Sequence, residues 1–325
     1  MKLIQTNGQP HFGRFLYAPD EFNLQDYRNP FLTKSWQRKL RYKKFSFVAI
    51  QHQHYSIGFA IVDLAWVGHG FYYCYNRKNK QYIQYDAIQP LAYKTQLQHI
   101  SEQNAQNFFQ HRQIQIDVRK GEDYRKIKIS HKNQVLCEAR IDTTFGQPLY
   151  MCSPTGVRGW TFTHKSMALN LQGHFYAEGQ QIAFDEHSLV MLDDSCGFLR
   201  PETEWFWLSS QNWIDGKKVG INLASGVNES CGNENCLWVD GQLYALSDVI
   251  FQPLDEQTWR VYSLDGQVEL QAKTSWRRYE HVNVGVMASQ FSQWITSIEG
   301  RITIAGQVQF FREHYALLEQ HYAKW

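Results

Sequence analysis

The chain has 325 residues, of which 43% are hydrophobic and 15% aromatic, so it can bury a large core and wholesale disorder is excluded. Its 33 basic and 31 acidic side chains give a net charge of +2, which provides no electrostatic footprint for a nucleic acid. At about 150 residues per domain, the length predicts two domains or one large β unit. Aromatic side chains favour strands and line pockets for apolar ligands, so the composition indicates a β protein.

The N-terminal stretch lacks the features of a targeting segment. Polar residues 7–9 and Pro10 stand where a signal peptide needs an apolar run. The best apolar run, 57–67, contains Asp63 and is strand-length, shorter than the roughly 20 residues of a membrane-spanning helix. We therefore expect no integral membrane segment and a cytoplasmic protein. The polar segment 20–44 is expected to wrap the surface or to include a short helix. We interpret the basic run at its end as a solvated edge, or alternatively as a phosphate or nucleic-acid contact.

The histidines and cysteines give no strong motif. His52 and His54 stand two residues apart and could share one face of a strand, but no third metal ligand lies nearby. Cys231 and Cys236 form the closest cysteine pair and are expected to be reduced thiols rather than a metal or redox site. Phosphate-cradling glycine loops are absent from the sequence. We expect no cofactor, no metal and no nucleic-acid partner, and the oligomeric state is left open.

Alternation of apolar and polar residues recurs along the chain and predicts strands with one wet face. It is clearest at 114–118, 127–129, 268–272 and 302–304. Turn signals stand between such runs, and Asp-Gly is the strongest of them; they lie at 120–122, 215–216, 240–241, 265–266 and 299–300. Regularly spaced strands predict an antiparallel sandwich or barrel. At the C-terminus, Phe311, Tyr315, Leu318 and Tyr322 have helical spacing, but residues 307–310 just before them alternate like a strand. We expect a strand that runs into an ordered tail, with one or two helical turns as an alternative for the tail.

A weak internal repeat suggests two similar domains. The segment 86–91 recurs approximately at 248–254, and each copy follows an aromatic-rich strand, at 45–47 and 205–207. Prolines and glycines between 146 and 160 are typical of a linker. We therefore expect an N-terminal β domain at 1–150 and a C-terminal β domain at 151–325.

The first candidate site is the stretch 192–207. Trp205 and Trp207 would place two indoles on one face of a strand. Asp194 precedes a glycine-containing turn and could be a general acid whose pKa is raised by burial beside the indoles. The alternative is that Asp194 caps a turn and the tryptophans belong to the core. His164, on an alternating strand, is a candidate for proton transfer or a structural histidine.

The second candidate site is a polar loop between two strands, 220–241. Its carboxamides and carboxylates could fix one polar group of an otherwise apolar ligand at the mouth of a barrel. The candidates are Asn222, Asn228, Glu229, Glu234, Asn235 and Trp238, with Glu234 as a possible catalytic group. Loops of this composition are also ordinary turns.

These stretches together resemble a bacterial family known as domain of unknown function 2804. The matching motifs lie at 38–47, 160–165, 194–207, 220–223, 234–241 and 319–325. The family is similar to a lipocalin-like group that includes carotenoid hydratases and tocopherol cyclases. The resemblance implies two tandem antiparallel lipocalin-like barrels or strongly curved sheets, with little helix, around a cavity for an isoprenoid or other lipid-like molecule.

Two classes of function fit these features. In the first, an enzyme without a cofactor, a lyase (hydratase) or an isomerase or cyclase, uses Asp194 as an acid in an aromatic-lined cavity. In the second, the same cavity binds and carries an apolar molecule without turnover. A structural interaction protein is a third interpretation, because exposed strand edges can pair with a partner.

Overall fold

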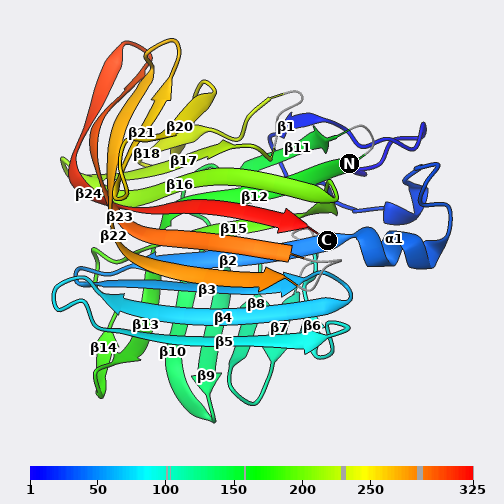
Figure 1. Cartoon of the computed structure of the whole chain (residues 1–325), viewed down its shortest axis with the longest axis horizontal. Helices are drawn as coiled ribbons and strands as arrows, with labels where there is room; N and C mark the ends of the chain where they lie inside the picture. The colour runs from blue at the N-terminus through cyan, green and yellow to red at the C-terminus, as the bar shows by residue number, and fades with distance from the viewer. Residues whose placement is uncertain (100–101, 103, 157–158, 228–231, 284–287, 325) are drawn as a thin grey trace. The chain divides into compact units, whose positions relative to one another are not determined.

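The computed structural model of the chain describes residues 1–99, 102, 104–156, 159–227, 232–283 and 288–324. It divides into two compact units, Met1–Leu199 (unit 1) and Arg200–Trp325 (unit 2). Strands form nearly all of the regular structure, and the described helices are the short η1 (Leu24–Asp26) and α1 (Ser35–Arg41), as Figure 1 shows. The prediction of an all-β protein with little helix is therefore confirmed, and α1 lies in the segment where a short helix was expected.

Unit 1 contains two antiparallel sheets, the first of which has eight strands. Their order is β1 (Gly13–Phe15), β11 (Leu149–Thr155), β12 (Gly159–Leu169), β15 (Leu189–Phe198), β2 (Lys43–Gln51), β3 (Tyr55–Asp63), β4 (Val67–Asn76) and β5 (Tyr82–Pro90). The apolar run at 57–67 supplies most of β3, whose residues are buried on both faces. This sheet carries both Asp194, on β15, and His164, on β12.

The second sheet of unit 1 has seven strands. Their order is β14 (Gln180–Ala183), β13 (Leu171–Ala177), β10 (Gln134–Asp142), β9 (Tyr124–His131), β8 (Gln115–Lys120), β7 (Gln106–Gln110) and β6 (Thr95–Gln96). The alternation predicted at 114–118 and 127–129 lies at β8 and β9, where buried isoleucines and Val118 alternate with wetter residues. Its inner residues pack on those of the eight-stranded sheet in one core that includes Val48, Ile57, Ile116 and Ile127.

The N-terminal segment closes one end of unit 1. Leu3, Ile4 and Tyr27 pack with Trp160 and Phe198 in a separate apolar cluster. Asn23 fixes the segment because its side chain pairs with both the N–H and the C=O of Ile4, each at 2.9 Å. Residues 20–34 therefore wrap the surface, while the chain enters β2 through α1.

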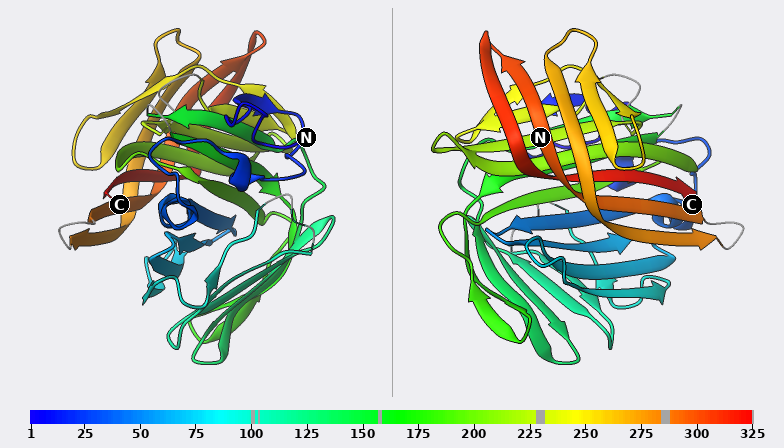
Figure 2. Two further views of the ribbon diagram at one scale, coloured as in Figure 1. Left: turned by 90° about the vertical axis from the view of Figure 1, so that its right-hand side faces the viewer. Right: turned by 60° about the vertical axis from the view of Figure 1, so that its left-hand side comes forward.

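Unit 2 is built on one antiparallel sheet of nine strands. Their order is β19 (Gln242–Ala245), β18 (Cys236–Val239), β17 (Lys217–Ser225), β16 (Glu202–Ile214), β24 (Gln307–Lys324), β23 (Ala288–Ile304), β22 (Val268–Asn283), β21 (Thr258–Ser263) and β20 (Val249–Pro253). The long strands β22, β23 and β24 bend strongly (Figure 2). One face buries an apolar core that includes Leu208, Ile221, Leu270 and Leu318. The sheets are strongly curved, as expected.

All but one of the turns predicted for unit 2 are found between strands. Asp215-Gly216 and Asp240-Gly241 join β16 to β17 and β18 to β19, with positive φ at both residues of each pair, as a tight hairpin requires. Glu299-Gly300, predicted as a turn, lies inside β23. Gly300 there has φ 131° beside a shift of register against β24, so it forms a bulge instead.

The strand expected near the C-terminus is found as β24, which runs through residues 307–324, so the alternative of one or two helical turns in the tail is not realised there. Glu313 has a positive φ of 54°, and the register against β23 shifts between Ile298 and Gly300. A bulge of this kind changes which alternate residues face the core, so Phe311 and Leu318 reach the same core from one strand. For that reason, the spacing of Phe311 and Leu318 along the sequence resembles the spacing of residues on one face of a helix.

Along the chain, unit 1 ends at Leu199, and not within the linker predicted at 146–160. Strands β11, β12 and β15 lie after residue 148, yet they hydrogen-bond in one sheet with β1 and β2. Unit 1 therefore extends to Leu199. The repeated segments 86–91 and 248–254 correspond to β5 and β20, which both lie at the edge of a sheet and end in proline. Proline is tolerated there because an edge strand needs fewer N–H donors.

Candidate functional site

A row of polar side chains crosses the inner face of the eight-stranded sheet. His164 on β12 is directly opposite Asp194 on β15, which is opposite Ser46 on β2, while Tyr150 on β11 is opposite His164. Opposed residues of antiparallel strands project from the same face. The register therefore brings His164 and Asp194, which the sequence proposed separately, into contact.

Asp194 accepts three hydrogen bonds. Its Oδ2 receives the Nη2–H of Arg125 at 2.5 Å and lies 3.1 Å from Nδ1 of His164, and its Oδ1 receives the hydroxyl of Ser46 at 2.6 Å. Arg125 projects from β9 of the facing sheet and is only 4% exposed. Asp194 thus lies in a charged network that joins the two sheets.

The raised pKa expected for Asp194 is wrong. Burial by itself raises the pKa of this carboxyl, but the charge of Arg125 and the hydrogen bonds from His164 and Arg125 outweigh burial. The net result is a pKa well below the usual range of aspartate. Asp194 is therefore a carboxylate at neutral pH and has no proton to give as a general acid.

His164 is held between two partners. Its Nδ1 faces Asp194, and its Nε2 lies 3.0 Å from the hydroxyl of Ser166, two residues along the same strand. The ring of Tyr150 stacks on the imidazole with centroids 5.1 Å apart. Burial lowers the pKa of His164 despite the opposing effect of Asp194, so the ring is neutral at pH 7. The carboxylate then assigns the proton to Nδ1 and leaves Nε2 as an acceptor.

Two small cavities adjoin Asp194, each with a volume of about 30 Å³. The first has an apolar side, formed by Phe22, Leu97 and Phe162, and its polar side includes Ser46 and His164. Each cavity has room for a water molecule, which needs about 10–15 Å³ of such space. A complete ligand pocket has about 300–1,000 Å³. The cavities therefore hold one reacting group, and the enclosed isoprenoid cavity implied by the family resemblance is not formed at Asp194.

The second cavity lies against the seven-stranded sheet. Lys120 on β8 and Arg125 on β9 are paired across those strands, and both line the cavity with Asn107. Gln98, His99, Asn107 and Asp194 line both cavities. Burial and the nearby charge of Lys44 lower the pKa of His99 to about 4, so His99 is also neutral at pH 7. Lys120, Arg125 and Asn107 were not predicted as site residues from the sequence.

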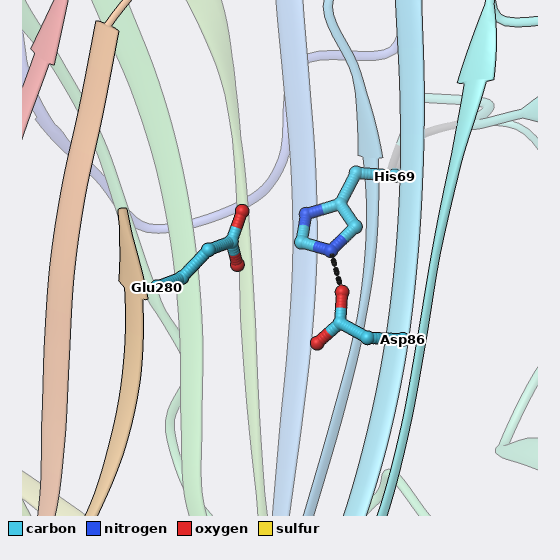
Figure 3. Close-up of side chains that lie close together, drawn as sticks. All are labelled: His69, Asp86 and Glu280. Atoms are coloured by element: carbon cyan, nitrogen blue, oxygen red, sulfur yellow. Dashed lines mark hydrogen bonds and ion pairs between the residues drawn. The ribbon is translucent and has the colours of Figure 1, made fainter. Parts of the chain in front are cut away.

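A separate histidine–carboxylate pair lies on the strands β4 and β5. Figure 3 shows Nε2 of His69 in hydrogen-bond contact with Oδ1 of Asp86. Glu280, which is also drawn there, belongs to unit 2. His52 and His54, considered above for a metal, have other contacts: Nε2 of His52 lies 3.8 Å from Asp185, and its Nδ1 accepts the backbone N–H of His54. The latter bond argues for a structural role of the pair.

Trp205 and Trp207 share one face of β16 in unit 2, as the alternation predicted. The indole of Trp205 donates to Oε1 of Glu319 at 2.8 Å, and that of Trp207 donates to Oδ1 of Asn222 at 2.7 Å. Gln293 donates to the other oxygen of Glu319 at 3.0 Å. Glu319 was quoted only within a family motif, although its carboxylate organises one tryptophan of this face.

Asparagine side chains at the polar loop between β17 and β18 hydrogen-bond to the backbone of the protein itself. Asn222 donates to the backbone C=O of Glu234 at 2.9 Å, and Asn235 accepts the N–H of Ala224 at 2.7 Å. Asn222, Asn235 and Trp238 are at most 1% exposed, and Glu234 is 8% exposed. These hydrogen bonds connect neighbouring strands, which agrees with the alternative that the loop is an ordinary turn. Asn228, Glu229 and Cys231 lie outside the described residues, and Cys236 is a buried free thiol.

The predicted site residues therefore belong to two groups. Asp194 and His164 contact each other in unit 1, whereas Trp205, Trp207, Asn222, Glu234, Asn235 and Trp238 belong to unit 2. In unit 1 the sequence missed Arg125, Ser46, Ser166 and Lys120. Each is an ordinary polar strand residue that belongs to no motif, so only its three-dimensional neighbours distinguish it from other strand residues. None of the helices among the described residues is long and apolar enough to cross a membrane.

Comparison with known proteins agrees with this architecture. Kievitone hydratase from Nectria haematococca shares 12% sequence identity, with 87% of this chain and 88% of that chain covered and a TM-score of 0.53. A candidate AttH from Nitrosomonas europaea also shares 12% identity, with 86% and 92% covered and a TM-score of 0.53. At this identity the likeness concerns the fold alone.

Sequence comparison is more specific for the family. A search of curated proteins gives no match. The model of domain of unknown function 2804, by contrast, matches residues 3–325, which is nearly the whole chain. The chain therefore belongs to the family of domain of unknown function 2804.

Proposed function

We propose that unit 1 binds a small, largely apolar molecule and adds water to it, or removes water from it, without a cofactor. The observation that carries the proposal is the buried contact between neutral His164 and ionised Asp194 beside a cavity of water size. Burying a charged network is costly, and such networks with shifted pKa values cluster at functional sites. The same class of chemistry is named for kievitone hydratase, whose fold is similar.

His164 is the proton-transfer residue in this proposal. His164 lines the first cavity, and its Nε2, an acceptor that the hydroxyl of Ser166 also contacts, takes a proton from the reacting water. The imidazolium that forms is stabilised by Asp194, which also fixes the orientation of the ring. Asp194 thus supports His164 instead of donating a proton itself. Phe22, Leu97 and Phe162 supply apolar contact for the part of the ligand nearest the reacting group.

A carrier without turnover is the second candidate. It is favoured by the ion pair between Asp194 and Arg125, which also serves to join the two sheets. The two candidates differ in the fate of the bound molecule. A hydratase exchanges oxygen with solvent at the site, whereas a carrier returns its ligand unchanged.

The test begins with the purified protein, from which the bound small molecule is extracted and identified by mass spectrometry. That molecule is then incubated with the protein in ¹⁸O-labelled water. We expect label in the product with the wild type, a loss of about 10²–10⁴-fold in rate for His164→Gln, and retained binding. His187→Gln is the control, since His187 is 69% exposed. Binding without any incorporation of ¹⁸O by the wild type would establish the carrier.

A further inference from the structure

The second cavity at Asp194 has hydrogen-bond donors that the protein does not use. Arg125 makes one hydrogen bond, from Nη2 to Asp194, among the described residues, although a guanidinium has five N–H donors. Lys120 is half-buried beside it, and its ammonium has no hydrogen bond or ion pair within the described part of the chain. Two cationic donors thus face one small cavity with spare N–H groups.

A carboxamide adds to this set. Asn107 accepts the N–H of Gln98 through its Oδ1 at 2.8 Å, which directs its NH₂ group away from that bond. No acceptor for this NH₂ group is found among the described residues. The cavity is therefore lined by several N–H donors that a ligand oxygen or a water can accept from. A ligand oxygen is the complementary group.

The charges around the cavity decide which kind of oxygen fits. Lys120 and Arg125 are balanced by Asp194 and by Glu102, whose carboxylate accepts from Nε2 of Gln98 at 2.9 Å and from the N–H of His99 at 3.1 Å. Lys44 is paired with Asp63 at 3.1 Å. The local charge is thus close to neutral, so the site offers hydrogen bonds without an excess positive charge. This favours the neutral oxygen of a carbonyl over a carboxylate.

We infer that Lys120 and Arg125 bind the carbonyl oxygen of a conjugated, unsaturated ketone or aldehyde, which is the substrate class of the hydration proposed above. The inference rests on that proposed function and deepens it. In this arrangement the carbonyl oxygen takes the place of a water in the cavity of Lys120 and Arg125, and the double bond lies on the His164 side of Asp194. Asp194, His99 and Asn107 line both cavities.

The chemistry balances without a cofactor. Water oxygen forms a bond to the carbon β to the carbonyl while its proton passes to Nε2 of His164, and the π electrons of the double bond move to the carbonyl oxygen. The enolate oxygen is stabilised by the N–H donors of Lys120 and Arg125. The proton then returns from His164 to the α carbon, which restores the carbonyl and gives the β-hydroxy ketone, so that one water has been added.

The state of Lys120 suits this role. Burial and the charge of Arg125 lower the pKa of Lys120 to about 8, with Asp194 and Glu102 opposing the shift. Lys120 therefore remains mainly protonated at neutral pH but is a more acidic donor than an ordinary lysine. A stronger donor is worth more to an oxyanion than to a ground-state carbonyl, which is the requirement for catalysis.

The test uses benzylideneacetone, an unsaturated ketone, and phenylbutene, which has the same skeleton without the carbonyl. We expect the wild type to bind the ketone more tightly, to lower the carbonyl stretching frequency of the bound ketone in difference infrared spectra, and to form the β-hydroxy ketone. Lys120→Met should lose the frequency shift and about 10²–10³-fold in kcat/KM, while phenylbutene binding stays unchanged. Lys126→Met, at an exposed position of β9, is the matched control.

Each other result has a definite meaning. If Lys120→Met binds and converts the ketone as the wild type does, or if the wild type binds both probes equally with no infrared shift, the carbonyl assignment is overturned. A shift that depends on Lys120 without product supports the assignment but contradicts the proposed hydration. If Lys120→Met does not fold, Lys120→Gln and the wild-type spectrum decide, because an unshifted carbonyl in the folded wild type already excludes these donors.

Discussion

At the scale of single residues, the site depends on a carboxylate that is ionised although it is largely buried. The positive charge of Arg125 keeps Asp194 ionised, and Arg125 is itself only 4% exposed. Each of these two groups therefore needs the other as a counter-charge. A buried ion pair of this kind contributes little net stability, but removing one partner leaves the other charge uncompensated. The pair therefore makes the two sheets of unit 1 dependent on each other.

Asp194→Asn is expected to destabilise unit 1 by about 3–5 kcal/mol, since it leaves Arg125 buried without a counter-charge. Arg125→Met/Asp194→Asn, which removes both charges, should be less destabilised than the sum of Arg125→Met and Asp194→Asn. Denaturant unfolding of the two single variants and the double variant measures these effects. A double variant that loses the sum of the two single losses would show that the groups do not act as a pair.

The same experiment has a pH arm. Because the pKa of Asp194 is depressed in the folded protein, its stabilising contribution is present above the unfolded-state pKa of about 3.9 and is lost as the pH falls from there toward the folded-state pKa. The double variant should lack this acid-sensitive part of the unfolding free energy.

At the scale of elements, the site requires a close approach of β12 and β15. A Cβ added at Gly197 would lie 2.0 Å from the carbonyl oxygen of Trp160 on the neighbouring strand, which no ordinary contact allows. Gly197 follows Asp194 by three residues on β15. The glycine therefore sets the spacing of the strands that carry His164 and Asp194.

Gly197→Ala should accordingly separate β15 from β12, cost about 1–3 kcal/mol of unfolding free energy, and weaken ligand binding at Asp194. Ser195→Ala on the same strand is the control for stability alone, since Ser195 itself lines the first cavity. Ser195 makes no side-chain hydrogen bond with the described residues, so its loss should change the stability by less than about 0.5 kcal/mol. Thermal unfolding of both variants provides the comparison, ligand binding by Gly197→Ala is compared with the wild type, and equal losses of stability would contradict a special role for the glycine.

At the scale of the whole molecule, the chain forms unit 1 by passing repeatedly between its two sheets: β11, β12 and β15 join the first sheet, whereas β6 to β10 and then β13 and β14 form the second. β12 and β15 lie between β11 and β2 in the eight-stranded sheet, so the strands after residue 150 complete a sheet begun at residue 13. A boundary at 150 would divide that sheet and expose long unpaired strand edges.

The fragment 1–199 should therefore fold with β-type circular dichroism and a cooperative unfolding transition, whereas the fragment 1–150 should not. Removing β12 and β15 deletes His164, Asp194 and the strands that join β11 to β2. Expression of both fragments and denaturant unfolding test this directly. Cooperative folding of 1–150 would instead support the boundary expected from the sequence.

The sequence by itself determined the strands and most of the turns, because these depend on local alternation and on backbone preferences that act over a few residues. It also indicated Asp194, His164 and the paired tryptophans. It misjudged the protonation of Asp194 because a pKa depends on neighbours in space. Arg125 and Ser46 are 69 and 148 residues from Asp194 along the chain, and no local pattern could connect them.

Only the tertiary structure decided which polar residues share a site. The register of β12, β15 and β2 placed His164, Asp194 and Ser46 in one row, and the packing of the seven-stranded sheet brought Arg125 and Lys120 opposite them. The tertiary structure also moved the unit boundary to Leu199, since strand order depends on long-range hydrogen bonds. Local sequence specifies which face of a strand a residue occupies, but the neighbours of that face are chosen by the pairing and packing of distant strands.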